Sequence, residues 1–509
     1  MAARVREGDI TSVELVEAHI AMIEEINPTL NALVVPTFDA AREDARAADQ
    51  ALKSGTVLGP LHGVPVTIKE FFDVRGTATT AGIESTKSVI EADSPLVARL
   101  RKAGAVILGK TNVAQMGIAI ESSNPVYGRT SNPWDATRTS GGSSGGEGAL
   151  IAAGGSPLGL GSDGGGSIRI PAHFNGICGL KPTSGRLTMH GHWQFPAFPR
   201  GWAVPGPLAR CVDDLELAMQ CLVARDGEPC DPTVAPGAIP SSKEIDLSSL
   251  TIGYFADDGF FAPSPAIRRA VDQSVEALKS AGANVVPFEQ ADALETWEIQ
   301  FRQFGADGGL WLRSFLHGSR SDTSIQKALL LSRIPTALRR VLPPLLSSIG
   351  QTSLAGVLQR VPESRLSAYG YQSVLEQQQA FRQTFRRRLN EQQIDALICP
   401  PFASVAMKHD SPDIVLAIAY THTFNLLGMP AGVIPATTVQ AEEESDRAPS
   451  KDDVVRDLLR AEAGSVGMPL GVQVVARHWR EDVALAVMRY LQDEMSKSAT
   501  FPQTPRAPA

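Results

Sequence analysis

Apolar residues near the N-terminus recur at the three- and four-residue spacing of a helix, which places them on one helix face. The segment before them offers a capping box, because Thr11 is followed three residues later by Glu14. The pattern predicts an amphipathic helix that begins after Thr11 and buries one stripe of residues: Val13, Val16, Ile20 and Ile23.

Two later segments combine a helical pattern, a glycine and an apolar strand, in that order. In the first, a helix is capped by Ser94, begins at Pro95 and ends near Gly104, where the apolar run AVILGK follows. The second covers residues 267–288. Two such units imply helices that cover a sheet. An α/β fold is therefore predicted, with further buried strands in PAGVIPATT from 430 and GMPLGVQVV from 467.

Composition narrows the class of protein. With 509 residues, 43% of them hydrophobic and 20% charged, the chain can bury a large core. Its net charge of −8 is spread without a long basic block, so we expect no nucleic-acid partner. The five cysteines include no CxxC pair and are too few for a disulfide framework, which favours a cytoplasmic protein. Because the sequence has neither a signal-peptide core nor a long apolar run, we expect no membrane span.

Glycines concentrate in GGSSGGEGAL (141–150) and GSDGGGSIR (161–169). Residues 159–164 match the dinucleotide pattern G-x-G-x-x-G, but β-branched residues and Pro171 follow in place of a helix start. No acid lies at the distance needed to hold a ribose, and no Walker loop is present. Nucleotide binding is therefore not expected.

Consecutive glycines have another use. Without Cβ atoms, Gly164, Gly165 and Gly166, together with Ser167, can point several backbone N–H groups at one spot, as stabilisation of an oxyanion requires. A serine at the end of such a nest is placed to attack a carbonyl carbon. The pattern indicates acyl transfer, which also needs a base.

The base is either a histidine or a lysine. Lys69 ends the apolar run GVPVTIKE, where burial would favour the neutral amine. None of the histidines stands in a convincing motif. His62 and His173 flank the motif segments, and His190 and His192 are interpreted as ordinary loop residues rather than metal ligands.

GVPVTIKE, GGSSGGEGAL and GLGSDGGGSIRIP, in this order, resemble the amidase signature family, whose members hydrolyse amide and related acyl bonds through a serine, serine, lysine triad. The resemblance implies that Ser167 is the nucleophile, with the nest as oxyanion hole. It makes Ser143 a bridging serine that follows a cis peptide from Gly142, and Lys69 the base. Neither cofactor nor metal is expected.

The residues around the triad are expected to support it. Ser144 is predicted to hydrogen-bond to Ser143, and Asp163 to form a buried pair with Arg169 that fixes the nest. Gly164 departs from the family, where a larger residue is common, so the oxyanion hole is expected to be less rigid.

Segments from KTNVAQMGIAIESSNPVYGRTSNPW (110–134) to GSVGMPLGVQVVA (464–476) look most like the fatty acid amide hydrolase branch of this family. The likeness implies one catalytic domain over 1–500, built on a central mixed sheet covered by helices on both faces. Residues 440–457 are expected to form an acidic surface loop, and 501–509 a flexible tail.

Two regions are expected to hold the substrate. The branch places Gly117, Ile118 and Ala119 near the scissile bond. The leucine-rich segment 328–350 is expected to form short amphipathic helices, either as a lid over an acyl channel or as a membrane contact. Its three arginines and three prolines are Arg333, Arg339, Arg340, Pro335, Pro343 and Pro344.

The sequence thus predicts an amidase that cleaves hydrophobic fatty acyl or aryl amides through an acyl-enzyme on Ser167, with esters, anilides and carbamates (urethanes) as further substrates. One alternative is the glutaminase subunit of a tRNA-dependent amidotransferase, which the leucine-rich segment disfavours. Another is a catalytically idle binding protein, which the complete triad disfavours. Similar enzymes are often dimers, so a homodimer is also considered.

Overall fold

The computed structural model describes residues 1–86, 88–193, 202–224, 231–235, 237–290, 293–316, 318–361, 363–411 and 417–505. Its centre is a sheet of eleven strands in the order β1-β3-β2-β6-β8-β7-β12-β13-β11-β9-β10, and β4 pairs with β5 separately. The strands are β1 (Leu33–Pro36), β2 (Pro65–Lys69), β3 (Val106–Thr111), β4 (Ser123–Asn124), β5 (Gly128–Arg129), β6 (Leu158–Asp163), β7 (Cys178–Lys181), β8 (Val204–Ala209), β9 (Thr251–Tyr254), β10 (Asn284–Pro287), β11 (Ala396–Cys399), β12 (Ala431–Thr438) and β13 (Pro469–Ala476).

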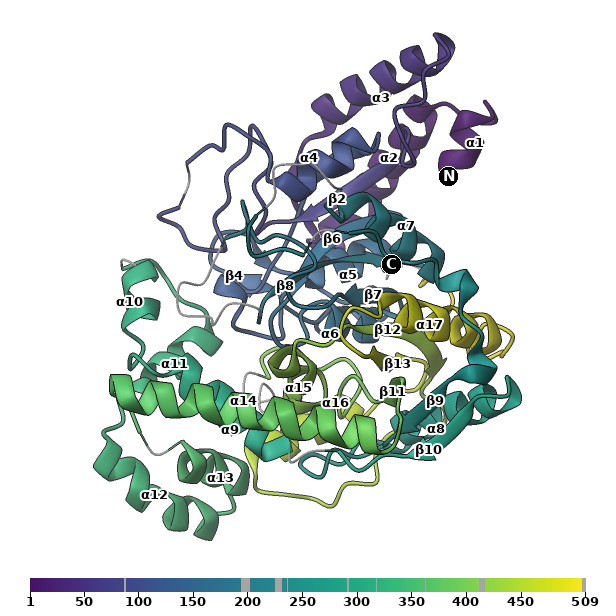
Figure 1. The fold of residues 1–509 in the computed structure, drawn as a ribbon. Helices are drawn as coiled ribbons and strands as arrows, with labels where there is room; N and C mark the ends of the chain where they lie inside the picture. The colour runs from purple at the N-terminus through teal and green to yellow at the C-terminus, as the bar shows by residue number, and fades with distance from the viewer. Residues whose placement is uncertain are drawn as a thin grey trace.

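Helices surround this sheet (Figure 1). The α-helices are α1 (Ala2–Arg6), α2 (Ser12–Leu30), α3 (Phe38–Lys53), α4 (Pro95–Lys102), α5 (Gly145–Ala152), α6 (Arg169–Asn175), α7 (Val212–Leu222), α8 (Pro265–Ser280), α9 (Ala293–Phe304), α10 (Leu310–Leu316), α11 (Thr323–Ser332), α12 (Thr336–Ser348), α13 (Thr352–Arg360), α14 (Ala368–Glu391), α15 (Ala419–Leu427), α16 (Asp453–Glu462) and α17 (Glu481–Met495). Short 3₁₀ turns are η1 (Gln115–Gly117), η2 (Ser242–Glu244) and η3 (Leu247–Ser249).

The sheet is mixed and buried on both faces, as the sequence predicted. Strand β2 runs parallel to β3 and β6, whereas β12 runs antiparallel to β13. Neighbouring residues of one strand enter different cores: Ala209 and Ile434 join the core of α4, α7, α8 and α17, while Leu208 and Val433 join that of α5 and α6. This alternation follows from the two-residue period of a strand.

The elements predicted from local patterns are present. The capping box holds, since the Thr11 hydroxyl accepts from the Glu14 N–H and the Glu14 carboxylate accepts from the Thr11 N–H. Both helix-to-strand units are found, as α4 before β3 and α8 before β10. Ser94 precedes α4 at the cap position, but its side chain makes no capping hydrogen bond.

Two expectations about prolines were wrong. A helix, α6, does begin soon after the glycine nest, because Pro171 falls in its first turn, where the missing N–H costs little. Helix α12 continues through Pro343 and Pro344, which were expected to interrupt it. Helix α12 tolerates its two prolines because it packs against α13.

The C-terminal segments are anchored to the rest of the chain. Within the expected acidic loop, Glu443 pairs with Arg269 and Asp446 with Arg268, and α16 begins at Asp453. Phe501 packs against the core of α4, α7, α8 and α17, while residues 506–509 of the expected tail lie outside the described residues.

Among the described residues, no helix has both the length and the apolarity to cross a membrane. Four described cysteines are free; Cys230 lies outside the described residues.

Candidate active site

The candidate triad is assembled at the carboxyl ends of two neighbouring strands. Lys69 is the last residue of β2, and β6, which runs parallel beside β2, ends at Asp163 just before the nest. Ser143 lies in the turn that precedes α5. Because parallel strands end at the same edge of a sheet, three segments distant in sequence meet there. Ser143 and Ser167 line one common cavity.

Lys69 is fully buried at this meeting point. Its Nζ lies 2.8 Å from Ser143 Oγ and 3.1 Å from the carbonyl oxygen of Ser162. The Phe71 ring covers it, with 4.8 Å from Nζ to the ring centroid. Burial lowers the pKa of Lys69 to about 7, although the charges of Asp163 and Glu147 oppose the shift. A large share of this amine is therefore neutral at physiological pH and able to accept a proton.

Glu147, the acid within GGSSGGEGAL, is a buried neighbour that the sequence reasoning did not assign. Its carboxyl oxygens accept hydrogen bonds from the Thr67 and Thr111 hydroxyls. Burial raises the pKa of Glu147 to about 8, against the effect of these hydroxyls. The group is consequently mostly protonated at neutral pH, which limits how strongly it can hold Lys69 in the charged form.

The nest is fixed by a fully buried ion pair between Asp163 and Arg169, as expected. Asp163 Oδ1 accepts from the Gly166 N–H at 2.7 Å, and Oδ2 accepts from the Ile168 N–H at 3.0 Å. Burial alone would raise the pKa of Asp163, but the Arg169 charge and hydrogen bonds hold it well below its usual range. The carboxylate thus stays ionised and orders the backbone on which Ser167 sits.

This arrangement reduces the number of N–H groups that can form the predicted oxyanion hole. The Gly166 N–H already donates to Asp163, so it is not available to a substrate oxygen. The N–H groups of Gly164, Gly165 and Ser167 have no acceptor among the described residues and remain free for that role. Gly166 itself has a φ of 126°, and a Cβ there would meet the Thr421 hydroxyl at 2.4 Å.

Ser143, the bridging serine, has the expected backbone conformation but lacks the hydrogen bond that was expected from Ser144. The peptide bond between Gly142 and Ser143 is cis, as the resemblance implied. The expected hydrogen bond from Ser144 to Ser143 is not formed; the Ser144 hydroxyl donates instead to the Ser162 carbonyl at 3.2 Å. The Ser144 N–H donates to the Ser167 carbonyl, so Ser144 links the two serine loops through their backbones.

The cavity beside the two serines has a volume of about 290 Å³. Gly117, Ile118 and Ala119 line it, where the sequence placed the substrate. The rest of its wall comes largely from α9 to α13, which lie together beside the sheet (Figure 1). From the leucine-rich segment, four residues reach the cavity: Ala328, Leu331, Ser332 and Arg339.

Arg339 behaves differently from the other arginines of that segment. It is buried and donates hydrogen bonds to the backbone carbonyls of Leu331 and Val361. It therefore ties α12 to the ends of α11 and α13, whereas Arg333 and Arg340 are exposed.

His192, which was interpreted as an ordinary loop residue rather than a metal ligand, does lie in a loop, but it also forms part of the cavity wall. Its ring is buried, lines the cavity, and packs edge-on against Phe71 and Phe72, while its Nε2 lies 2.9 Å from Ser162 Oγ. Burial lowers the pKa of His192 to about 3, with a further contribution from Lys69, so the ring is neutral. Only the fold brings this loop beside β2, so nothing local to His192 in the sequence indicates the contact.

The other histidines considered as bases lie elsewhere. His173 is buried within α6, and its two ring nitrogens contact the Ser404 carbonyl and the Gly471 N–H. His62 accepts from the Leu58 N–H. Neither lines the cavity, so among the described residues Lys69 is the group next to Ser143 that can serve as a base.

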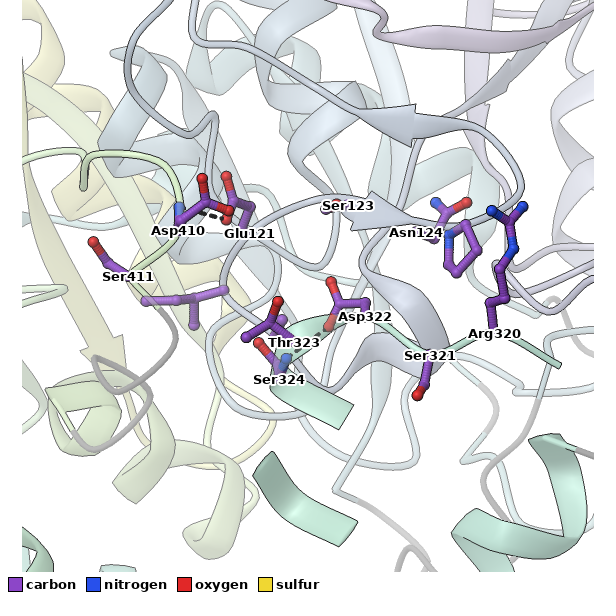
Figure 2. Close-up of a pocket in the computed structure, with 13 residues that line it drawn as sticks. Glu121, Ser123, Asn124, Arg320, Ser321, Asp322, Thr323, Ser324, Asp410 and Ser411 are labelled. Carbon is purple, nitrogen blue, oxygen red and sulfur yellow. Dashed lines mark hydrogen bonds between the residues drawn. The ribbon is translucent and has the colours of Figure 1, made fainter. Parts of the chain in front are cut away.

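A second, polar cavity of about 330 Å³ adjoins the first (Figure 2). The two share Ala119, Ile120 and Ser324 as a common wall. Glu121, labelled in Figure 2, points into this cavity, where it accepts from the Asp410 N–H and contacts His409. The apolar cavity therefore ends at a wall of small and apolar residues, with polar groups on its far side.

Comparison with known proteins agrees with this geometry. The family model described as Amidase matches residues 14–485. Fatty acid amide hydrolase 1 of Caenorhabditis elegans is 33% identical over 503 residues, 96% of this chain and 86% of the relative. Indoleacetamide hydrolase of Bradyrhizobium diazoefficiens is 38% identical over 301 residues, 58% of this chain and 57% of the relative. A solved structure of a fatty acid amide hydrolase superposes with a TM-score of 0.81 at 27% identity, covering 97% of this chain and 84% of that one.

Proposed function

This chain belongs to the amidase family of amide-cleaving hydrolases, and on that premise we propose that it cleaves hydrophobic amides through an acyl-enzyme on Ser167. The observation that carries the proposal is the buried contact of 2.8 Å between Lys69 Nζ and Ser143 Oγ, beside a cavity that Ser167 also lines. The names of two relatives, a fatty acid amide hydrolase and an indoleacetamide hydrolase, favour amides of fatty acids and of acids that carry an aromatic ring as substrates.

In the proposed reaction the neutral amine of Lys69 takes a proton from Ser143, and Ser143 takes one from Ser167. The Ser167 oxygen meanwhile bonds to the carbonyl carbon. The carbonyl oxygen becomes an oxyanion, which the N–H groups of Gly164, Gly165 and Ser167 stabilise.

The relay then runs in reverse. Lys69 returns its proton to Ser143, and Ser143 gives one to the leaving nitrogen as the carbon–nitrogen bond breaks. Protonation is required because an amide anion is a very poor leaving group. Water next attacks the acyl-enzyme by the same relay, which releases the acid and restores Ser167. Esters and carbamates, which have the same carbonyl centre, would be processed in this way too.

The substrate class is tested with a panel of a long-chain acyl amide, p-nitroacetanilide, an aryl carbamate and glutamine. We expect kcat/KM to be highest for the acyl and aryl amides, because apolar side chains of α9 to α13, such as Trp297, Phe301 and Leu358, line the cavity beyond the serines. Turnover of glutamine alone would contradict the proposal and favour the amidotransferase alternative.

We also propose that α12 rests on a lipid surface. Four apolar residues on one face of it and at its C-terminal end are between 45% and 65% exposed: Leu338, Val341, Leu345 and Ile349. They recur at spacings of three and four; the exposed Arg340 is next to Val341 in the chain, and the exposed Arg333 lies just before α12. An apolar stripe flanked by arginines suits an anionic bilayer, and substrate dissolved in lipid would then meet the helices that line the cavity.

The double variant Val341→Glu, Leu345→Glu is expected to bind vesicles of anionic phospholipid at least about tenfold more weakly than the unmodified protein, because each buried aliphatic side chain contributes roughly 1.5–3 kcal/mol. Co-sedimentation measures the change. A matched control, Val57→Glu with Val466→Glu, alters exposed apolar residues outside α12 and should bind like the unmodified protein. Equal loss in both variants, or no vesicle binding at all, would contradict the proposal.

A further inference from the structure

A layer of side chains separates Lys69 from the cavity beside the two serines. Lys69 is fully buried and does not line this cavity, whereas Phe71, Ser143, Ser162 and His192 do. The Phe71 ring covers the amine, with 4.8 Å from Nζ to the ring centroid. Because an amine loses its proton more easily when water is kept from it, the packing of this layer governs the charge of Lys69.

His192 contacts two members of this layer. Its ring packs edge-on against Phe71 and Phe72, with 5.5 and 4.7 Å between the ring centroids. Its Nε2 lies 2.9 Å from the hydroxyl oxygen of Ser162. The carbonyl oxygen of the same Ser162 accepts a hydrogen bond from Lys69 Nζ at 3.1 Å. His192 therefore touches both the ring that covers the amine and the residue whose backbone holds it.

The loop of His192 is fastened to the segment that follows Lys69. The Trp193 N–H donates to the Phe71 carbonyl at 2.6 Å, and Phe72 and His192 pair as an isolated β-bridge. Burial lowers the pKa of His192 to about 3, with a further contribution from the charge of Lys69. The ring is therefore neutral at physiological pH and adds no positive charge beside the amine.

We propose that His192 is a positioning residue for Lys69, which holds Phe71 and Ser162 in place and so keeps solvent in the cavity away from the amine. The inference rests on the proposed role of Lys69 as the base. It adds a residue outside the triad whose packing decides at which pH the base is available.

The charged groups that act on Lys69 stay the same when His192 is replaced. They are Asp163 at the end of β6 and Glu147 on α5, and both favour the protonated amine. Burial opposes them and is the larger effect. A variant that lets water reach the amine weakens only the effect of burial, so the pKa of Lys69 should rise.

The test measures the rate of Ser167 labelling by a fluorophosphonate across pH, in the full-length unmodified protein and in His192→Ala. We expect the midpoint of the rise with pH to move up by about one unit or more, toward the ordinary lysine pKa of about 10.4. The plateau at high pH should change less than about threefold, because neutral Lys69 is still present, and this also shows that the variant is folded. An unchanged midpoint, or a rate lowered by one factor at every pH, would overturn the inference.

Two further variants sharpen the comparison. His192→Gln keeps a side-chain N–H that can reach the Ser162 hydroxyl, so its midpoint should move less than that of His192→Ala. Equal movement in both would overturn the role given to the Ser162 contact. The matched control is His62→Ala, since His62 is fully buried but does not line the cavity. A shifted midpoint in this control would show a general loosening of the fold and overturn the assignment to His192.

The same titration separates the inference from the proposed function. If the unmodified protein shows the rise near pH 7 and His192→Ala loses it entirely, His192 is itself the titrating group and the inference fails alone. If the unmodified protein shows no such rise, the proposed role of Lys69 is refuted and the inference falls with it.

Discussion

Replacing Lys69 by methionine is expected to lower kcat/KM for an aryl amide by roughly 10³-fold, the middle of the range of what a general base contributes. The variant removes the amine 2.8 Å from Ser143 Oγ, and with it both the proton acceptor for attack and the donor for the leaving nitrogen. Methionine keeps most of the buried volume, so the fold should be retained. Steady-state kinetics with p-nitroacetanilide measure the effect. Unchanged turnover would contradict the assignment.

The same residue sets the expected pH dependence. Burial lowers the pKa of Lys69 to about 7, so the active neutral form predominates above that pH and is lost below it. Activity should therefore fall about tenfold per unit as the pH drops below 7 and level off above it. In Lys69→Met this limb should disappear from whatever activity remains.

Other buried lysines provide controls for this assignment. Burial lowers the pKa of Lys110 to about 8 and that of Lys181 to about 7. Lys110 donates to the Ala78 carbonyl and Lys181 to the Met429 carbonyl, and neither lines the cavity. Lys110→Met should keep the pH limb. Loss of the limb in this control would mean that the titration does not report on Lys69.

Ser167→Ala is expected to reduce amide turnover by roughly 10⁴-fold or more, because loss of the nucleophile removes the covalent route altogether. It should also abolish labelling by a fluorophosphonate. Ser143→Ala keeps the nucleophile but interrupts the relay, so labelling should persist at a lower rate. Intact-mass measurement of the adduct distinguishes the three proteins.

Ser144→Ala is the matched control for both serines. Its hydroxyl donates to the Ser162 carbonyl and lies outside the proposed proton path. Labelling should stay within about tenfold of the unmodified protein, as loss of one neutral hydrogen bond usually costs about 1 kcal/mol. Labelling that survives Ser167→Ala would show that another residue is the nucleophile.

The sequence was sufficient to predict the residues that meet at the strand ends. Lys69 stands out because a charged residue ends an apolar run, and the glycine-rich segments mark where backbone N–H groups gather. These signals are local, since each depends on the residues of one segment. The consequence that parallel strands bring Lys69 beside the nest follows from general rules of sheet topology.

His192 could not be found in the same way. It reaches the cavity only because a loop far along the chain packs beside β2, and it has no distinctive neighbourhood in the sequence. The support of the nest was likewise only partly predictable. The pairing of Asp163 with Arg169 followed from the resemblance, but the use of the Gly166 N–H by Asp163 depends on the geometry of the turn.

The two proline errors have separate causes. Local preference disfavours a helix at Pro171 and across Pro343 and Pro344, yet α6 and α12 form. Pro171 falls in the first turn of α6, where a missing N–H costs little, and contacts with α13 give α12 a stabilisation that a short window of sequence does not show.

The claim on which everything else depends is that Lys69 is an uncharged base. It is tested most directly by the rate of fluorophosphonate labelling at Ser167, measured across pH in the unmodified protein and in Lys69→Met. We predict that the rate in the unmodified protein rises with pH and levels off above about 7, and that Lys69→Met lacks this rise. A rate that is independent of pH, or that rises only near the ordinary lysine pKa of about 10.4, would contradict the account.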